Sequence, residues 1–187
     1  MGPSGSGKST LLNLISLIDR PTSGIIKFNK NQINFNEKEQ NDIFRSKKIG
    51  IVYQQNNLLP DFTALENIYL ASLAVNDDKE LAISNAEKLL KKINLLKRAD
   101  HFPSQLSGGE AQRIAIARAI VNEPEIILAD EPTGSLDIET AKDIFELLNK
   151  QKKSDRLIIF ATHNRFFANK ADCLLEMLDG SIKSSNA

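Results

Sequence analysis

A glycine-rich loop near residue 1 constrains the fold of this chain more than any other feature. Residues 2–9 read GPSGSGKS and fit the pattern G-x-x-x-x-G-K-[ST]. Apolar residues then recur with helical spacing between Lys8 and Ile18, so the loop stands at the N-terminus of a helix. Backbone N–H groups and the positive end of the helix dipole favour an anion at such a place. The loop therefore predicts a phosphate site against residues 5–9.

Two short apolar runs predict an α/β fold with a mostly parallel sheet. The runs 125–130 and 157–162 are continuous, as in parallel strands that are covered on both faces. Residues 137–151 have the helical spacing of a crossover between them. Other strands are expected at 24–29, 48–53 and 173–178, with a polar, mobile stretch between the first two and a hairpin turn at Asp179-Gly180 leading into 181–183.

The middle of the chain changes to helical spacing. Residues 61–75, 77–93 and 108–121 each show this spacing and few β-branched clusters. Thr63 and Glu66 have the spacing of a capping box, which places a helix start at Thr63. We expect a single domain, in which residues from about 56 to 107 form a helical subdomain inserted into an α/β core made of residues 1–55 and 108–187.

The charge balance argues against nucleic acid as a partner. Lys and Arg together number 24, as do Asp and Glu, so the chain lacks the basic field that neutralises phosphates on DNA or RNA. No apolar run approaches the roughly 20 residues that cross a bilayer. The one cysteine, Cys173, lies in an apolar run and is expected to be a small buried residue. It cannot form an internal disulfide, which fits a reducing compartment.

Two carboxylates end the run 125–130 and supply the chemistry that a nucleotide site needs. In a chain that also contains the glycine loop, Asp130 is expected to hold Mg²⁺ through water. Glu131 is expected to orient and polarise the attacking water as general base. Lys8 would reach the β- and γ-phosphates, while the Ser9 hydroxyl would ligate Mg²⁺. Thr10 would help to hold the α-phosphate. The predicted ligands are ATP and Mg²⁺, and the predicted nucleotide-binding residues of the loop are Gly2, Pro3, Ser4, Gly5, Ser6, Gly7, Lys8, Ser9 and Thr10.

The string Leu106-Ser107-Gly108-Gly109-Glu110 is the third motif. Its two glycines leave backbone N–H groups unobstructed at a helix N-terminus, which makes a second anion site. With the loop at 2–9 and the carboxylates at 130–131, this string resembles the ATP-binding subunits of ABC transporters, over nearly the whole chain. The resemblance implies a RecA-like P-loop NTPase core and a head-to-tail homodimer. In that dimer Ser107 and Gly109 would serve the γ-phosphate of ATP on the partner subunit, and Gly108 is predicted with them as a nucleotide-binding residue.

The same resemblance implies roles for three more residues. Asp137, in Ser135-Leu136-Asp137, matches the D-loop that crosses the dimer interface. His163 matches the switch histidine on the γ-phosphate, whereas His101 is expected to be a surface residue. Gln54 matches the glutamine that senses Mg²⁺ and the attacking water, and Gln55 is the alternative. In the helix after the third motif we expect Ile114, Ile116 and Ala117 in the core, and Arg113 and Arg118 as ordinary helix-face charges.

Three further segments indicate which group of ABC transporter ATPases this chain resembles. Residues 57–67 (NLLPDFTALEN), 103–105 (PSQ) and 175–177 (LEM) resemble the ATPases of lipoprotein-releasing Lol systems. Related ATPases of macrolide and peptide exporters and of the cell-division complex are the alternatives. The resemblance implies ATP hydrolysis that moves two integral membrane permease subunits and releases lipoproteins. It also implies a peripheral location on the cytoplasmic face of the bacterial inner membrane.

The chain departs from the family pattern at two places. Family members enter the glycine loop from a buried strand, which follows a small β-subdomain with an aromatic residue that stacks on adenine. No segment here matches those parts, so we expect an N-terminally truncated cassette, and a catalytically inactive binding subunit is a rival hypothesis. Asn164 follows the histidine where the family has an acidic residue. A chromosome-repair cassette is disfavoured, because the chain has neither long heptad arms nor a DNA-binding charge.

Overall fold

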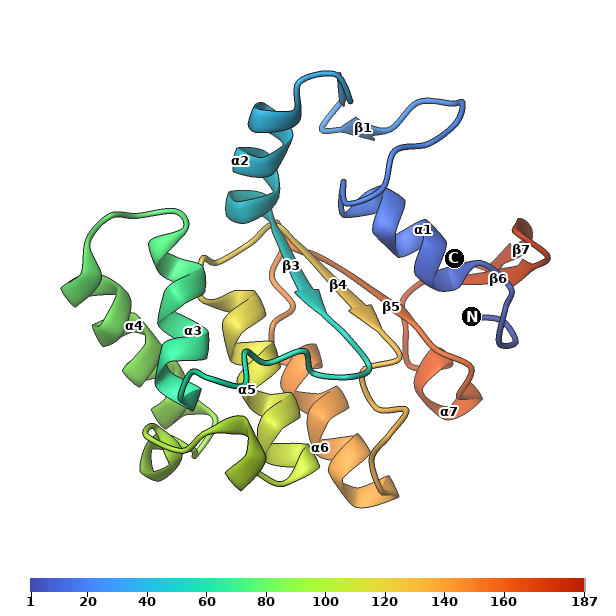
Figure 1. Cartoon of the computed structure of the whole chain (residues 1–187). Helices are drawn as coiled ribbons and strands as arrows, with labels where there is room; N and C mark the ends of the chain where they lie inside the picture. Colours follow the sequence, from blue (N-terminus) through green and yellow to red (C-terminus); the bar gives the residue numbers. More distant parts are fainter. Residues whose placement is uncertain (187) are drawn as a thin grey trace.

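Three parallel strands form the central sheet of the computed structural model, which describes residues 1–186 (Figure 1). Their order is β3 (Ile49–Val52), β4 (Ile126–Asp130) and β5 (Leu157–Ala161), with Ile51 opposite Leu128 and Leu128 opposite Ile159. Helix α6 (Ile138–Asn149) is the crossover from β4 to β5. The predicted parallel pair and its crossover helix are confirmed.

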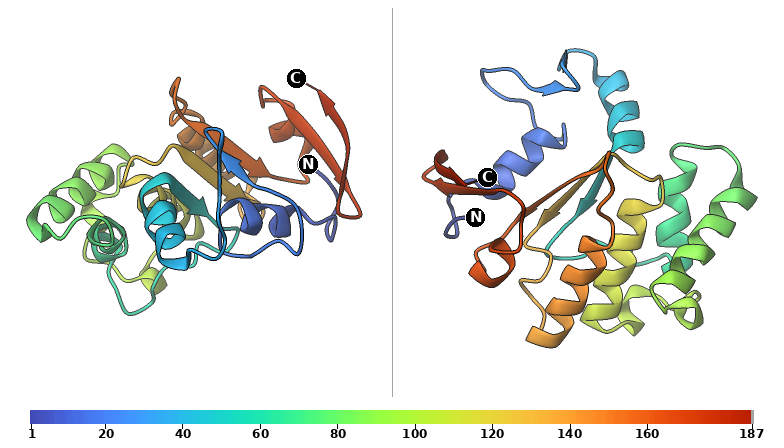
Figure 2. Two further views of the ribbon diagram at one scale, coloured as in Figure 1. Left: turned by 90° about the horizontal axis from the view of Figure 1, so that it is seen from above. Right: turned by 180° about the vertical axis from the view of Figure 1, so that it is seen from behind.

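Helices lie on both faces of this sheet (Figures 1 and 2). On one face α5 (Gly108–Ile120) and α6 bury Ile116 and Ile144 against Val52 and Ile127. On the other face α1 (Lys8–Ile15) buries Leu12 in a cluster that also contains Ile49, Ile126 and Leu128. Neighbouring residues of β4 thus pack on opposite faces, which explains its continuous apolar sequence.

A separate helical cluster packs against the outer side of α5. It contains α3 (Ala64–Leu73), α4 (Lys79–Lys92) and the short 3₁₀ helices η1 (Leu96–Arg98) and η2 (Pro103–Gln105). Ile68 and Leu90 bury their side chains against Ile114 of α5. The predicted capping box starts α3, since the Thr63 side chain accepts a hydrogen bond from the Glu66 N–H and the Glu66 carboxylate accepts one from the Thr63 N–H. As expected, Ile114, Ile116 and Ala117 are fully buried.

The segment between residues 16 and 48 differs from expectation. Helix α1 ends at Ile15 instead of Ile18, and Leu17 has a left-handed φ of 60°. The first predicted strand, 24–29, is reduced to β1 (Lys27–Phe28), which pairs with β2 (Asn31–Gln32) in the stretch expected to be mobile. The expected mobile stretch contains the helix α2 (Lys38–Lys48), none of whose residues is buried. Because α2 is strongly polar and buries no residue, its sequence reads as a loop.

The last elements are α7 (Arg165–Ala168) and the predicted hairpin, whose strands are β6 (Leu174–Leu178) and β7 (Ser181–Asn186). Met1 extends along β6, because its ammonium donates to the Leu175 carbonyl and its carbonyl accepts the Met177 N–H at 2.8 Å.

A mostly apolar cavity of about 350 Å³ lies between β5 and β6. Strand β5 packs on both faces as expected, with Ile158 and Phe160 on one face and Ile159 on the other, but the cover is partial, since Leu157 at its start is 55% exposed. Cys173 is exposed at the edge of this cavity, and its expected burial is wrong.

Candidate active site

The glycine loop wraps the start of α1 and leaves backbone donors free. Gly5 and Gly7 have φ values of 79° and 95°, a left-handed conformation that glycine adopts at no steric cost. Gly7 caps α1 without a side-chain hydrogen bond, so no side chain occupies the N–H groups of the first turn. The Ser6 hydroxyl is buried without a hydrogen-bond partner. A phosphate fits these features, because it accepts from hydroxyl and N–H donors together.

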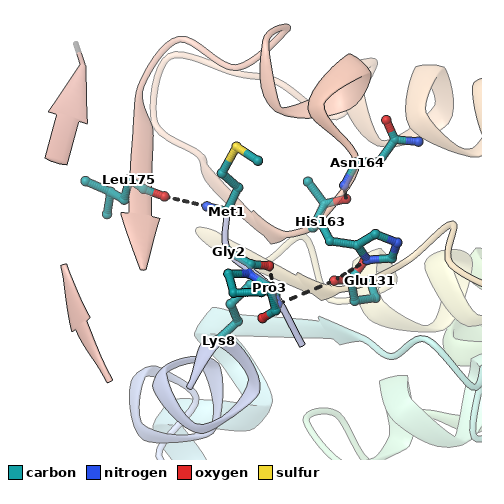
Figure 3. Close-up of polar contacts among 9 residues, drawn as sticks. Met1, Gly2, Pro3, Lys8, Glu131, His163, Asn164 and Leu175 are labelled. Atoms are coloured by element: carbon teal, nitrogen blue, oxygen red, sulfur yellow. Dashed lines mark hydrogen bonds and ion pairs between the residues drawn. The ribbon is translucent and has the colours of Figure 1, made fainter. Parts of the chain in front are cut away.

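Lys8 is held inside the loop. The residue is only 9% exposed, and its Nζ donates to the carbonyl oxygens of Gly2 and Pro3 at 2.8 and 2.9 Å. The same Nζ lies 3.8 Å from Oε1 of Glu131 (Figure 3). The ammonium group therefore stands between the loop and the end of β4, with the loop carbonyls as its closest partners.

Glu131 and His163 face each other beyond the ends of β4 and β5 (Figure 3). The His163 Nδ1 lies 3.0 Å from the Glu131 carboxylate, whose side chain is 13% exposed. Glu131 has a left-handed φ of 46° and donates its N–H to the Ala161 carbonyl at 3.0 Å. Non-glycine residues adopt this conformation uncommonly, and strained residues of this kind cluster at active sites. A carboxylate held in this way can accept a proton from a water molecule.

Asp130 is suited to bind a cation through a water molecule. Its Oδ1 is buried and has no hydrogen-bond partner, an unsatisfied state that costs free energy unless a bound water or ion relieves it. Ser9 is exposed on the first turn of α1. Among residues 1–186, no group of three or more His, Cys, Asp or Glu side chains is placed to hold a metal. An ion here would thus rely on one or two protein ligands, water and phosphate oxygens, which is the coordination that Mg²⁺ prefers.

Gln54 reaches the same region from the end of β3. A Cβ atom added to Gly134 would lie 2.9 Å from Nε2 of Gln54, so the Gln54 amide packs directly against the Gly134 backbone. The Gly134 N–H in turn donates to the Glu131 carbonyl at 2.9 Å. Gln54 is therefore in contact with the loop that carries Glu131.

The third motif, residues 106–110, forms the candidate second anion site at the start of α5. Ser107 caps the helix in a capping box with Glu110, and hydrogen bonds from the Ser107 N–H and then from Arg98 lower the pKa of the Glu110 carboxyl. Gly109 packs so closely on α6 that an added Cβ would lie 2.5 Å from Cγ2 of Thr140. Asp137 caps α6 through the Glu139 and Thr140 N–H groups, and hydrogen bonds from the Thr140 side chain and then from these N–H groups lower the pKa of its carboxyl.

The structure thus separates the predicted site residues into two sets. Lys8, Asp130, Glu131, His163 and Gln54 gather at the carboxyl edge of the sheet. The second set, Ser107, Gly108, Gly109 and Asp137, lies where α5 and α6 begin, well apart from α1 in both views of the ribbon (Figures 1 and 2).

Two residues near Gln54 were missed by sequence reasoning. Arg118 is not an ordinary helix-face charge, because it donates to the carbonyl oxygens of Asn56 and Asn57. Gln112 is 2% exposed and donates to the Tyr53 carbonyl. The one available signal was the position of Gln112, a polar residue between the apolar core positions Ala111 and Ile114.

Comparison with known proteins identifies the family. A profile described as "ABC transporter" matches residues 1–134. The chain belongs to the ABC transporter family. It is similar to the lipoprotein-releasing system ATP-binding protein LolD of Legionella pneumophila (strain Lens), with 46% identity over 97% of this chain and 81% of that protein. LolD of Ehrlichia ruminantium (strain Gardel) is 43% identical over 98% and 82%.

Solved structures confirm the fold of this ABC ATPase as a P-loop NTPase with a parallel sheet. The dimeric ATP-binding cassette MJ0796 in a post-hydrolysis state, bound to ADP and Pi, superposes with a TM-score of 0.90 at 39% identity, over 100% of this chain and 82% of that one. A second similar structure is cbiO1 from Clostridium perfringens, described as part of the ABC transporter complex cbiONQ, with a TM-score of 0.85 and 28% identity over 99% of this chain and 74% of that one. Within residues 1–186 of the ABC ATPase, every helix is too short or too polar to cross a membrane.

Proposed function

We propose that this ABC ATPase binds and hydrolyses ATP to drive the release of lipoproteins from the inner membrane toward the outer membrane. The observation that carries the ATPase is the convergence of Lys8, Glu131 and His163 at the carboxyl edge of the sheet. The lipoprotein cargo is supported by the LolD relatives, which are named for lipoprotein release and are matched over nearly the whole of this chain.

Glu131 is the general base in the proposed mechanism. It takes the proton of the attacking water, and His163 at 3.0 Å holds the carboxylate in place and reaches toward the γ-phosphate. Lys8 exchanges its hydrogen bonds to the Gly2 and Pro3 carbonyls for bonds to the β- and γ-phosphates when ATP binds. The N–H groups in the first turn of α1, which no side chain caps, would surround the phosphates.

The residues that would hold Mg²⁺ are Ser9, Gln54 and Asp130. The orphaned Oδ1 of Asp130 supports this assignment, because a cation-bound water would satisfy it. When bound, the ion neutralises negative charge on the phosphates. Gln54 joins this set through its contact with Gly134, next to the loop that carries Glu131.

The working unit is proposed to be a homodimer. Ser107, Gly108, Gly109 and Asp137 lie apart from the glycine loop of their own chain, so they are available to complete the site of a partner subunit. The similar cassette MJ0796 is described as dimeric, which supports a dimer here. Two integral membrane permease subunits would complete the transporter, with the ATPase peripheral on the cytoplasmic face of the inner membrane.

The surface after Gln54 is the proposed contact with the permeases. Leu59 and Phe62 precede α3 in the helical part, residues 56–107, and are 44% and 38% exposed. Apolar side chains exposed together at a loop are typical of surfaces that bind another protein.

Steady-state turnover of Mg²⁺-ATP by the full chain tests the ATPase. Lys8→Ala should abolish turnover, whereas Lys88→Ala, at an exposed position of α4, should leave it unchanged. Equal turnover rates for the wild type and Lys8→Ala would contradict the proposed ATPase activity. Purification of the chain with its membrane partners tests the cargo: permeases that carry lipoproteins are expected, and a partner set free of lipoproteins would count against this substrate.

A further inference from the structure

Helix α5 fixes the segment after β3, which contains Gln54, by a hydrogen bond just N-terminal to Gln54. Gln112 of α5 donates its Nε2 to the Tyr53 carbonyl at 3.0 Å, and its side chain is almost completely buried. This bond fixes the backbone immediately before Gln54. A buried donor without such a partner would be costly, so the pair is a stable attachment.

Arg118 fixes the same segment on the C-terminal side of Gln54. One guanidinium nitrogen, Nη2, donates to the Asn56 carbonyl and the other, Nη1, to the Asn57 carbonyl, both at 2.8 Å. Asn57 has a left-handed φ of 48°, and the Asn56 side chain accepts the Leu58 N–H at 3.2 Å. The planar fork of Arg118 thus holds two consecutive carbonyls of a sharply bent chain.

Further contacts connect these hydrogen bonds to the candidate active site. Gln54 lies between the two anchored points, and its amide packs against Gly134, whose N–H donates to the Glu131 carbonyl. An unbroken set of contacts therefore joins α5 to the loop of Glu131. The helix that makes these attachments is the one that begins with Ser107 and the second anion site.

We propose that Gln112 and Arg118 are positioning residues that set Gln54 relative to Glu131 and thereby link the start of α5 to ATP hydrolysis. This inference rests on the proposed ATPase function. Neither residue touches the nucleotide; each acts through the backbone of residues 53–57. Displacement of Gln54 should slow the chemical step without weakening nucleotide binding, since Lys8 and the loop N–H groups are unchanged.

Arg118→Lys in the full chain tests the inference, because a lysine ammonium cannot donate to both carbonyls in the geometry of the fork. We expect kcat for ATP to fall by about tenfold to a hundredfold, the size of effect that follows from small misplacement of a reacting group. KM and the affinity for ATP should stay unchanged. In the Gln54→Ala background, Arg118→Lys should cause no further fall in kcat.

Arg156→Lys is the matched control. Arg156 is also buried and also donates to two carbonyls, those of Pro124 and Gln151, far along the chain from Gln54. This variant should leave kcat unchanged even if it lowers the melting temperature. The same fall in kcat in both arginine variants would overturn the inference, as would an undiminished effect of Arg118→Lys in the Gln54→Ala background.

Amide hydrogen exchange gives a readout that does not need activity. Exchange in the segment 53–58 should be faster in Arg118→Lys than in the wild type and in Arg156→Lys. Unchanged exchange would overturn the attachment itself. A wild type without Lys8-dependent turnover would instead overturn the proposed ATPase and the catalytic role with it, while faster exchange would still report the attachment.

Discussion

At the scale of single residues, Glu131 has the strongest geometric support for a chemical role. Its backbone is left-handed, its carboxylate is nearly buried, and His163 and Lys8 lie on either side of it. We predict that Glu131→Gln lowers kcat by about 10²–10⁴-fold, because the amide cannot accept the water proton. ATP binding should persist, since the change keeps the side-chain shape. Turnover and equilibrium ATP binding measure the two effects.

A matched control for this variant is Glu146→Gln, at an exposed position of α6. It should hydrolyse ATP as the wild type does. Wild-type turnover by Glu131→Gln would show that another group accepts the proton.

Glu110 gives a pH-dependent prediction. Hydrogen bonds from Ser107 and Arg98 hold the pKa of the Glu110 carboxyl below its ordinary value of 4.5. A lowered pKa in the folded state means that this carboxylate stabilises the protein fully above pH 4.5, and that the contribution is lost as pH falls through the folded-state pKa. Glu110→Gln keeps an acceptor for the capping box but does not titrate.

Urea unfolding of both proteins at neutral pH and at about pH 3 measures this contribution. The wild type should lose more stability on acidification than Glu110→Gln does. Other carboxyls titrate in both proteins and cancel in the difference. An equal loss in the two would mean that the Ser107 and Arg98 bonds contribute nothing to the charged form.

The positions of Glu131 and His163, each directly after a predicted parallel strand, were visible in the sequence. The structure pairs these strands as β4 and β5 and brings the two side chains together at one edge of the sheet, while their catalytic roles stay predictions. Sequence reasoning failed for Arg118 and Cys173. The partner of a helix-face arginine depends on which loop covers that face, and the exposure of Cys173 depends on how β6 sits relative to β5; neither follows from local pattern.

At the scale of elements, one asparagine holds the entry into α3. Asn67 is fully buried; its Oδ1 accepts the Leu59 N–H at 2.7 Å, and its Nδ2 donates to the carbonyl oxygens of Leu59, Phe62 and Thr63 at 3.1, 2.9 and 3.0 Å. Asn67→Ala would leave the Leu59 N–H and the Phe62 carbonyl without these partners, whereas the Leu59 and Thr63 carbonyls would keep the backbone N–H groups of residues 62 and 67. The expected loss in the free energy of unfolding is about 1–3 kcal/mol.

Denaturant unfolding measures that loss, with Asn76→Ala as the control at an exposed position after α3. The control should change stability by less than about 0.5 kcal/mol. A similarly small change in Asn67→Ala would mean that water replaces the amide at no cost.

The elements also show which parts of a fold local pattern can predict. Strands β3, β4 and β5 bury short apolar runs and helices α3 to α6 bury an apolar side, and both kinds of pattern were visible in the sequence. Helix α2 is strongly polar and buries no residue, and it packs through contacts such as the Phe28–Phe44 ring pair, 4.9 Å between centroids. The partner of one aromatic residue in a polar segment does not follow from the local sequence.

At the scale of the whole molecule, the two sets of site residues lie apart in one chain, and association of two chains is the simplest way to unite them. If Lys8, Glu131 and His163 of one subunit face Ser107–Gly109 and Asp137 of the other, ATP is the bridge between subunits. A bridging ligand stabilises the dimer in proportion to its occupancy, and hydrolysis removes that stabilisation. Dimerisation should therefore require ATP and should persist only while ATP remains intact.

The molar mass of the Glu131→Gln chain in solution, measured by light scattering with and without Mg²⁺-ATP, tests this. Without nucleotide we expect the monomer mass, and with Mg²⁺-ATP twice that mass, because the variant cannot remove the bridge. Lys8→Ala in the same background should abolish the increase, since the phosphates lose their lysine contact. A monomer in both conditions would show that the two sets of residues do not meet across a nucleotide-dependent interface. A dimer in both conditions would show that ATP is not the bridge.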